Sequence, residues 1–501
     1  MGTVSKLLVT TAILMVSIAS ANAVSLKVGL QDDPDALDPA VGGTYAGRIV
    51  FDALCDKLVD VDRDLNIVPK LATEWSWNDS NTALTMKLRQ GVVYHDGTAF
   101  NAQSVKANIE RMKTLSDSKR KSELSPVTGV DVVDDHTVTL RLEKPFAPLL
   151  SILTDRSGMM ASTQAATAAG EKFAAAPVCS GRFKFVSRSA RDSMKLEKFN
   201  EYWNAAEIGY DSIEYLILPD STVRLSRLQA GDLDVIERVA PTAISAINND
   251  SRLALHDSPG LGVSHLFINV RSDSGSALAE HPELRKALEL SLDRSAINQV
   301  AFNGAFTADN QMLTPLSAFH SKEHPIPARD VERAKQLIAE SGVDNPAIEI
   351  TYENSLTDGR VAQMIQAMAS EAGFQVQLLP LETSSAIERY LAGNFQLYIG
   401  NWSGRADPDP TLNTFFSSAG SQNLNGYNSP EVDTLLTQAR GELDEAARVG
   451  LYSQITGMLL EDLPTIPLYH PSWIYGARAN VDGIQIYPDG ILRVSGLKPK
   501  N

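Results

Sequence analysis

The alternation of apolar and polar residues predicts strands and one helix near the N-terminus. In the segment 25–30, apolar residues alternate with polar neighbours, as in a half-buried strand. The same pattern recurs over 81–95 and 131–143, and these segments bracket a helical pattern over 102–114. The arrangement predicts a compact α+β unit inserted after the first strand.

Strand and helix patterns alternate at short spacing in the second half of the chain. The predicted order is strand 348–352, helix 358–372 ended by Gly373, strand 374–379, helix 385–392 ended by Gly393, and strand 395–399. Such an order with short connections implies right-handed crossovers and a parallel sheet. Ligands of these sheets lie beyond the carboxyl ends of the strands. The loops 353–360 and 400–408 are therefore candidate binding loops.

A further helix is predicted over 282–302, because Pro282 suits a first helical position. Its apolar residues recur at helical spacing, and we expect them in a core: Leu284, Leu288, Leu292 and Ile297.

The first 23 residues have the three parts of a secretory signal peptide. Lys6 precedes the apolar run 7–19, and Ala21 and Ala23 form an A-x-A cleavage pattern. We expect cleavage after Ala23 and export of a soluble mature chain. An uncleaved membrane anchor is the alternative, but it needs about 18 to 20 consecutive apolar residues, and threonine and serine interrupt this run.

Composition indicates an ordinary globular protein of several domains. The chain has 501 residues, 43% of them hydrophobic, and roughly 150 residues make a domain. With 45 basic and 61 acidic side chains the net charge is −16, and no basic run offsets it. Because this charge repels phosphate backbones, we expect no nucleic-acid partner. The two cysteines, Cys55 and Cys179, leave a disulfide and buried free thiols open as alternatives.

The sequence contains no catalytic or cofactor-binding motif that the flanking residues support. The H-x-x-E-H string at 320–324 would need one helix face to bind zinc, but Pro325 follows at once. Gly260 and Gly262 lack a third glycine at dinucleotide-binding spacing. No phosphate-binding loop and no G-x-S-x-G element occurs in the sequence. We therefore predict no cofactor, no metal and no catalytic residue.

A series of short motifs follows in order along the mature chain. They are Phe51-Asp52-Ala53-Leu54, Ile67-Val68-Pro69-Lys70-Leu71-Ala72, Trp75-Ser76-Trp77, Leu88-Arg89-Gln90-Gly91-Val92, His95-Asp96-Gly97-Thr98-Ala99-Phe100, Ser180-Gly181-Arg182-Phe183, Tyr202-Trp203, Leu228-Gln229-Ala230-Gly231-Asp232-Leu233-Asp234, Phe267-Ile268-Asn269, Leu292-Asp293-Arg294 and Trp402-Ser403-Gly404-Arg405-Ala406-Asp407-Pro408-Asp409. Together they resemble the dipeptide, oligopeptide, nickel and glutathione-binding family of periplasmic ABC-importer receptors, over nearly the whole mature chain.

The resemblance implies an α/β, two-lobed periplasmic binding protein fold with an extra α+β domain inserted in the first lobe. Carried onto this chain, lobe one comprises 24–50, 178–265 and 478–501, the inserted domain 51–177, and lobe two 266–477. The chain would cross between the lobes twice. The resemblance also implies a Cys55–Cys179 disulfide, because the motifs beside these cysteines bracket the insertion.

One position departs from the peptide-binding members of this family. Those relatives commonly place an Asp three residues beyond the Trp of the Trp402 motif, where it pairs with the peptide amine. Here the residue is Arg405, whose guanidinium suits carboxylate or phosphate. The departure predicts an anionic ligand group at this point. The alternative is that Arg405 only pairs with Asp407 or Asp409.

The resemblance thus implies a non-enzymatic periplasmic receptor that captures a small polar ligand by hinge closure, as a monomer, and delivers it to an inner-membrane ABC permease. Peptides, glutathione-like and opine-like compounds and short glycans remain open as ligands. The predicted ligand-binding residues are Tyr45, Arg360, Trp402, Ser403, Gly404 and Arg405. A secreted hydrolase acting on peptides or glycans is the alternative class, and a receptor serving a sensor is another.

Overall fold

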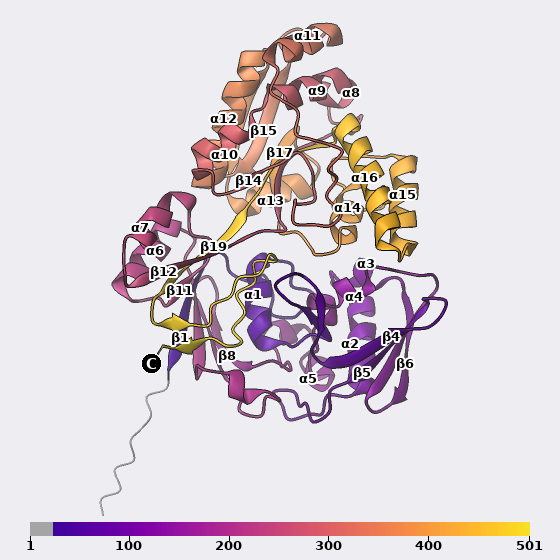
Figure 1. Ribbon diagram of the computed structural model, residues 1–501, viewed down its shortest axis with the longest axis vertical. Coiled ribbons are helices and arrows are strands. Elements are labelled where there is room, and N and C mark those ends of the chain that lie inside the picture. The colour runs from indigo at the N-terminus through magenta and orange to yellow at the C-terminus, as the bar shows by residue number, and fades with distance from the viewer. Residues whose placement is uncertain (1–23, 501) are drawn as a thin grey trace, which may run out of the picture.

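The computed structural model describes residues 24–500, so the predicted signal peptide over 1–23 lies outside the described residues. Within 24–500 the strands form a seven-stranded, a six-stranded and a four-stranded sheet and two two-stranded pairs. We call the parts built on the three large sheets lobe one, lobe two and the inserted domain. Lobe two stands above the other two parts in Figure 1. No helix within 24–500 is long and apolar enough to cross a bilayer.

Lobe one is built on a mixed sheet. Its strand order is β12 (Leu253–Pro259), β19 (Ser472–Arg478), β11 (Val235–Ile236), β1 (Ser25–Leu30), β10 (Ser212–Ile217), β9 (Ser193–Lys198) and β8 (Phe183–Ser189). Its helices are α1 (Tyr45–Leu54), α6 (Ser221–Ala230) and α7 (Ile244–Asn248), with short η3 (Ala205–Glu207) and η4 (Pro241–Ala243). Residues 46–54 of α1 are all buried, so this helix lies in the core. The C-terminal segment, with the pair β20 (Val481–Asp482) and β21 (Lys498–Pro499), packs on the same core.

Lobe two carries the second large sheet. Its order is β14 (Thr307–Ala308), β18 (Thr465–His470), β13 (Val263–Ile268), β17 (Leu397–Trp402), β15 (Ala347–Glu353) and β16 (Gln375–Leu381). Its helices are α8 (Ala277–Glu280), α9 (Pro282–Ser291), α10 (Arg294–Phe302), α11 (Val331–Ser341), α12 (Leu356–Ala372), α13 (Thr383–Leu391), α14 (Asp409–Phe416), α15 (Pro430–Gly441) and α16 (Glu445–Asp462). Strand β15 pairs in parallel with β16 and β17, which confirms the predicted parallel unit.

The predicted single helix over 282–302 is wrong, because the chain forms α9 and α10 instead. Leu292 adopts an extended conformation after α9, and the Asp293 side chain accepts the Ala296 N–H as the N-cap of α10. The expected core residues are nevertheless buried in one cluster: Leu284, Leu288, Leu292 and Ile297.

The inserted domain has a four-stranded antiparallel sheet covered by helices. The strand order is β4 (Ala72–Trp77), β5 (Ala83–Leu88), β7 (Thr137–Leu142) and β6 (Val127–Asp134), and β2 (Val59–Val61) pairs with β3 (Ile67–Pro69). The helices are α2 (Ala102–Thr114), α3 (Lys121–Leu124), α4 (Leu149–Ile152), η1 (Arg156–Gly158), α5 (Thr163–Ala169) and η2 (Gly170–Ala175). Helix α2 confirms the helix predicted over 102–114, and Asn101 closes its N-terminus with a capping box.

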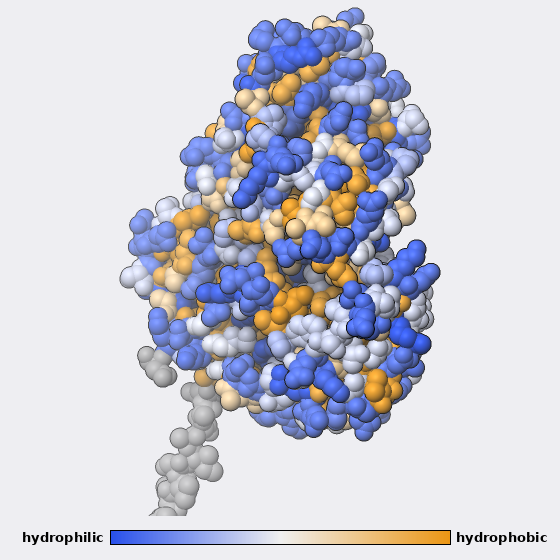
Figure 2. Space-filling view, turned by 45° about the vertical axis from the view of Figure 1, so that its right-hand side comes forward, coloured by the Kyte–Doolittle hydropathy of each residue, from blue (hydrophilic) through white to orange (hydrophobic). Residues whose placement is uncertain are grey.

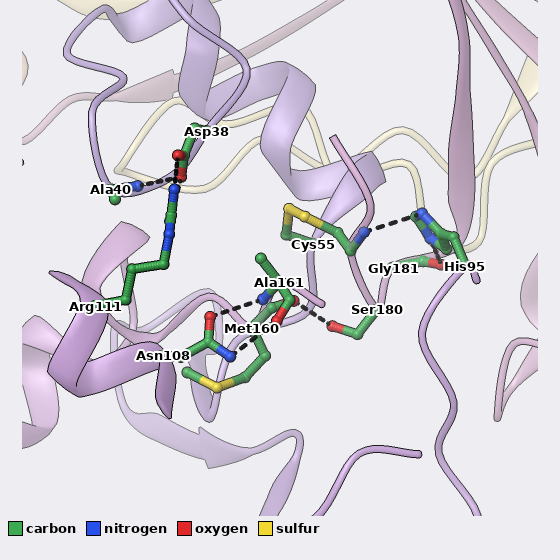
Figure 3. Close-up of a disulfide and its surroundings, with 11 residues drawn as sticks. Asp38, Ala40, Cys55, His95, Asn108, Arg111, Met160, Ala161, Ser180 and Gly181 are labelled. Carbon is green, nitrogen blue, oxygen red and sulfur yellow. Dashed lines mark hydrogen bonds and ion pairs between the residues drawn. A yellow bond between two sulfur atoms is a disulfide. The ribbon is translucent and has the colours of Figure 1, made fainter. Parts of the chain in front are cut away.

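The Cys55–Cys179 disulfide is present and joins the two ends of the insertion (Figure 3). Beside it, the His95 Nδ1 accepts the Cys179 N–H at 3.3 Å, so Nε2 is the nitrogen that donates to the Gly181 carbonyl at 3.0 Å. Burial lowers the pKa of His95 to about 4, consistent with this neutral ring. Phe51 and Phe173 belong to the core of lobe one, while the core of the inserted domain runs from Leu58 to Met160 besides Ala40. That core is thus narrower than the predicted 51–177.

The chain passes between the two large sheets at two neighbouring points. β12 ends at Pro259 and β13 begins at Val263, while β18 and β19 are separated by Pro471 alone. These points lie before the predicted changes of lobe at 265/266 and 477/478. A single intervening residue leaves no boundary signal in the sequence. His470 Nδ1 lies 2.7 Å from the Gly262 carbonyl, so the two connections contact each other.

Candidate functional site

Arg405 lies where lobe two meets the inserted domain. It follows β17, and its Nε is 3.0 Å from Oδ2 of Asp155, which precedes η1. Its Nη1 donates to Ser403 Oγ at 3.1 Å and to the Gly404 carbonyl at 2.6 Å. Arg405 therefore connects two parts of the molecule that are far apart in sequence.

The local partners considered for Arg405 are taken by other arginines. Asp407 accepts both Nη groups of Arg448 at 2.9 and 3.0 Å. Asp409 accepts Nε and Nη2 of Arg440 at 2.6 and 3.1 Å. The alternative pairing of Arg405 with Asp407 or Asp409 is therefore wrong.

Trp402 and Gly404 shape the loop that carries Arg405. The Trp402 Nε1 donates to Thr411 Oγ1 at 3.0 Å, and the Arg405 guanidinium lies 4.9 Å from the centre of its ring. Gly404 has φ +71°, and an added Cβ would lie 2.0 Å from the Leu261 carbonyl oxygen. The close approach made by Gly404 is thus to a connection between the lobes.

Tyr45 begins α1 and contacts the C-terminal part of the chain. Its hydroxyl donates to the Gly490 carbonyl at 2.5 Å, and its ring stacks on Trp473 at 4.5 Å. The Arg238 guanidinium lies 4.8 Å from the same ring. Burial raises the pKa of Tyr45, so this phenol stays protonated.

Arg360 is exposed on α12 and makes no hydrogen bond or ion pair with the other residues of 24–500. The structure does not bring it into contact with the other five predicted site residues. Ser403, Gly404 and Trp402 lie together with Arg405, whereas Tyr45 lies on lobe one.

Three further arginines lie around Asp155, and they are not among the residues predicted from the sequence. Arg48 Nε is 3.3 Å and Arg156 Nε is 3.7 Å from Oδ1 of Asp155. Arg120 Nη1 donates to Glu123 at 2.7 Å. We call Arg48, Arg120, Arg156 and Arg405 the arginine cluster. In Figure 1, α3, which begins directly after Arg120, lies on the side of the inserted domain that faces lobe two.

The arginine cluster holds more positive charge than its two carboxylates neutralise. Burial and neighbouring arginines lower the pKa of Arg405 to about 10, and burial lowers that of Arg156 to about 9. Although burial opposes it, Arg48 and Arg405 hold the pKa of Asp155 well below its usual value. Arg405 and Arg156 are therefore still charged near neutral pH, although their surroundings disfavour that charge.

A second cluster, with an excess of negative charge, lies around Arg238, and we call it the acidic cluster. Its carboxylates come from both lobes: Asp32 and Glu237 from lobe one, and Glu353 and Asp358 from lobe two. Arg238 pairs with Asp32 at 3.2 Å and lies 3.8 Å from Glu237. Burial and the charge of Asp358 raise the pKa of Glu353 to about 7, and burial raises that of Asp358.

Both clusters join residues of lobe two to residues of lobe one. Figure 2 shows a recess in the middle of the surface, bordered by hydrophobic residues. A surface hollow of about 640 Å³ lies elsewhere, beside Ala347 and Gln375 at the amino ends of β15 and β16. The lobe-two residues of both clusters lie instead at the carboxyl ends of β15 and β17, the end at which parallel sheets bind ligands. Within 24–500 no group of His, Cys, Asp and Glu could hold a metal ion.

Comparison with known sequences decides the family. The bacterial extracellular solute-binding proteins, family 5 Middle, match residues 66–423. The chain belongs to this family. The glutathione-binding protein GsiB of Pectobacterium atrosepticum is 27% identical over 467 residues, covering 91% of this chain and 90% of that protein. GsiB of Escherichia coli K12 is 25% identical over 489 residues, covering 95% and 94%.

Solved structures share the fold along almost the whole chain. Helicobacter pylori DppA in complex with the peptide STSA superposes with a TM-score of 0.87 at 21% identity, covering 96% of this chain and 99% of that one. AgaA from A. tumefacien R10 in complex with agropinic acid superposes with a TM-score of 0.85 at 24% identity, covering 95% of this chain and 99% of that one. The two-lobed periplasmic binding protein fold is thereby confirmed. The protein is a solute-binding receptor of the ABC-importer type rather than an enzyme, and nothing supports the hydrolase alternative.

Proposed function

We propose that this receptor captures a small polar solute carrying an anionic group and delivers it to an inner-membrane ABC permease. The observation that supports the anionic group is the position of Arg405, buried between lobe two and the inserted domain beside Arg48 and Arg156. A buried arginine excess favours a ligand with carboxylate or phosphate groups.

The relatives and structural neighbours fit this ligand chemistry. Glutathione, named for the GsiB relatives, carries carboxylates, and the ligand of AgaA is agropinic acid. A glutathione-like or opine-like compound is therefore favoured over a peptide held by its amine. The residue that would bind that amine in peptide-binding relatives is Arg405 here.

We assign the ligand to Tyr45, Arg360, Trp402, Ser403, Gly404 and Arg405, with the arginine cluster added. Trp402 offers a flat apolar ring, Arg405 holds an anionic group, and the exposed Arg360 is free to turn toward the ligand. Closure would occur about the connections at 260–262 and Pro471, with contacts to both lobes stabilising the closed form.

The remaining proposals concern the mature protein. We propose cleavage after Ala23, a soluble monomer in the periplasm and no nucleic-acid partner, in line with the net charge of −16. For the domains, we propose lobe one, inserted domain and lobe two in the predicted order, with the changes of lobe moved to 260–262 and Pro471.

Native mass spectrometry of the protein purified from its host would identify the bound solute. Calorimetry with that solute and with glutathione then tests Arg405. We expect Arg405→Ala to weaken binding by at least about thirtyfold, because the buried anion loses its partner. Arg405→Lys should restore only part of the affinity, because the ammonium is a point charge and cannot make the two parallel hydrogen bonds of the planar guanidinium.

The matched control is Arg333→Ala, which removes an exposed arginine of α11 paired with Glu340. It should leave affinity unchanged. An affinity for the co-purified solute within about threefold of wild type in Arg405→Ala would refute the anionic preference. A chemically altered solute after incubation would refute the receptor role itself.

A further inference from the structure

The arginine cluster has a fixed surplus of charge that the protein does not neutralise. Arg48, Arg120, Arg156 and Arg405 contribute four positive charges, and Asp155 and Glu123 contribute two negative ones. Arginine cannot lose its proton in a protein, so the surplus of two persists at every physiological pH. Buried charge without a counter-charge is costly, which indicates that an anion belongs here.

Neighbouring acidic groups are already paired. Asp489 accepts two guanidinium nitrogens of Arg493, and Asp60 lies 2.6 Å from Lys57 Nζ. Glu123 is bound by Arg120 and by the Ser157 hydroxyl. The charge surplus therefore cannot be met by moving one of these carboxylates without leaving another cation unpaired.

Donors without acceptors remain inside the cluster. The Nη1 of Arg48, the Nε of Arg120 and the Nε of Arg156 are buried and make no hydrogen bond within the described part of the chain. Arg48, Arg120 and Arg156 are only 7%, 4% and 3% exposed. Unsatisfied buried donors are rare in native proteins and call for an acceptor such as a ligand oxygen.

We propose that the arginine cluster is a subsite for a ligand group carrying two negative charges, either a pair of carboxylates or a doubly charged oxyanion. This inference rests on the proposed receptor function and narrows its ligand class. A group with one negative charge would leave one buried guanidinium unmatched, whereas a dianion neutralises the whole surplus.

The position of the cluster connects binding to closure. Arg48 comes from lobe one, Arg120 and Arg156 from the inserted domain, and Arg405 from lobe two. Three of the four groups therefore stay together when the lobes separate, and Arg405 joins them only in the closed form. A dianion on the first three stabilises closure by attracting Arg405.

Calorimetry and thermal unfolding of the dialysed mature protein, at constant ionic strength and pH 7.5, test the proposal. The probes are succinate against propionate and sulfate against chloride. We expect at least about tenfold tighter binding of one dianion than of its monoanion, and the two pairs distinguish dicarboxylate from oxyanion. Arg156→Gln should reduce this preference below about threefold, and Arg48→Gln serves if that variant fails to fold.

Arg333→Gln, on the far surface of α11, should retain the preference. Equal affinity for dianion and monoanion, a preference retained in both cluster variants, or no binding of succinate and sulfate at about 20 mM would overturn the proposal. If these results appear while Arg405→Ala still loses the co-purified solute, the receptor function stands and only the dianion subsite is refuted.

Discussion

The arginine cluster and the acidic cluster lie between the same lobes but meet their surplus charge in opposite ways. The acidic cluster places four carboxylates around Arg238, and the pKa of Glu353 rises to about 7, so protonation can remove part of the surplus. The arginine cluster has no such route, because guanidinium groups keep their protons. A buried surplus of positive charge therefore points to a ligand more strongly than a buried surplus of negative charge.

The largest expected effect comes from removing the carboxylate that the arginine cluster shares. Asp155→Asn leaves Arg48 and Arg405 without their common partner. We expect the free energy of unfolding to fall by about 3–5 kcal/mol, as when one partner of a buried pair is removed. Urea unfolding of the mature protein measures this.

The control for Asp155→Asn is Asp273→Asn, which removes an exposed pair with Arg271 and should leave the free energy of unfolding nearly unchanged. A loss below about 1 kcal/mol in Asp155→Asn would mean that the cluster is not held by this carboxylate.

In the acidic cluster, we expect the carboxylate of Glu353 to lower the stability of the fold as the pH rises. Because the pKa of Glu353 rises from 4.5 to about 7 on folding, its contribution to stability is fully present below pH 4.5 and is lost as the pH rises through 7. Wild type should lose about 1–3 kcal/mol over this range relative to Glu353→Gln. Unfolding curves at several pH values measure the difference.

Glu332→Gln, an exposed change on α11, should follow the wild-type pH profile. Parallel pH profiles for wild type and Glu353→Gln would show that Glu353 ionises normally and would remove the contrast between the two clusters.

Tyr45 offers the smallest and most local test. Its ring contacts Arg238 of the acidic cluster, and its hydroxyl binds the Gly490 carbonyl. Tyr45→Phe keeps the ring and its stacking on Trp473, so we expect a loss of about 1 kcal/mol in unfolding free energy. Solute affinity, measured by calorimetry, should stay within about threefold, because the ring that we assign to the ligand is kept and the lost hydroxyl is bound to Gly490. A larger loss of affinity would place the phenol on the ligand.

Local patterns were sufficient for much of the fold. The predicted helix 358–372 is α12, and the three predicted strands of the parallel unit are β15, β16 and β17. These elements could be predicted because the spacing of apolar residues and the glycines that end helices are signals between neighbouring residues. The break between α9 and α10 was not predicted, because the helical spacing of apolar residues continues across Leu292. The break depends on the Asp293 side chain, which accepts the Ala296 N–H and so begins a new helix.

The site was less predictable, because it depends on contacts between distant segments. Arg405 was found through a departure at one motif position, but its partner Asp155 lies 250 residues earlier in the numbering. Arg120 and Arg156 have no local signal. Arg48 had one, since it is the single charged residue among the first seven of the apolar helix Tyr45–Leu54. A charged residue in so apolar a stretch is paired or functional.

The Cys55–Cys179 bond has a mechanical consequence. It closes a sequence separation of 124 residues that contains the whole inserted domain, so tension applied to the chain ends passes through the sulfur atoms and around that domain. Pulling the oxidised protein apart should leave about 400 Å of contour length unreleased, and reduction should return it. The inserted domain, and with it Arg120, Arg156 and Asp155, is shielded from any force that separates the termini.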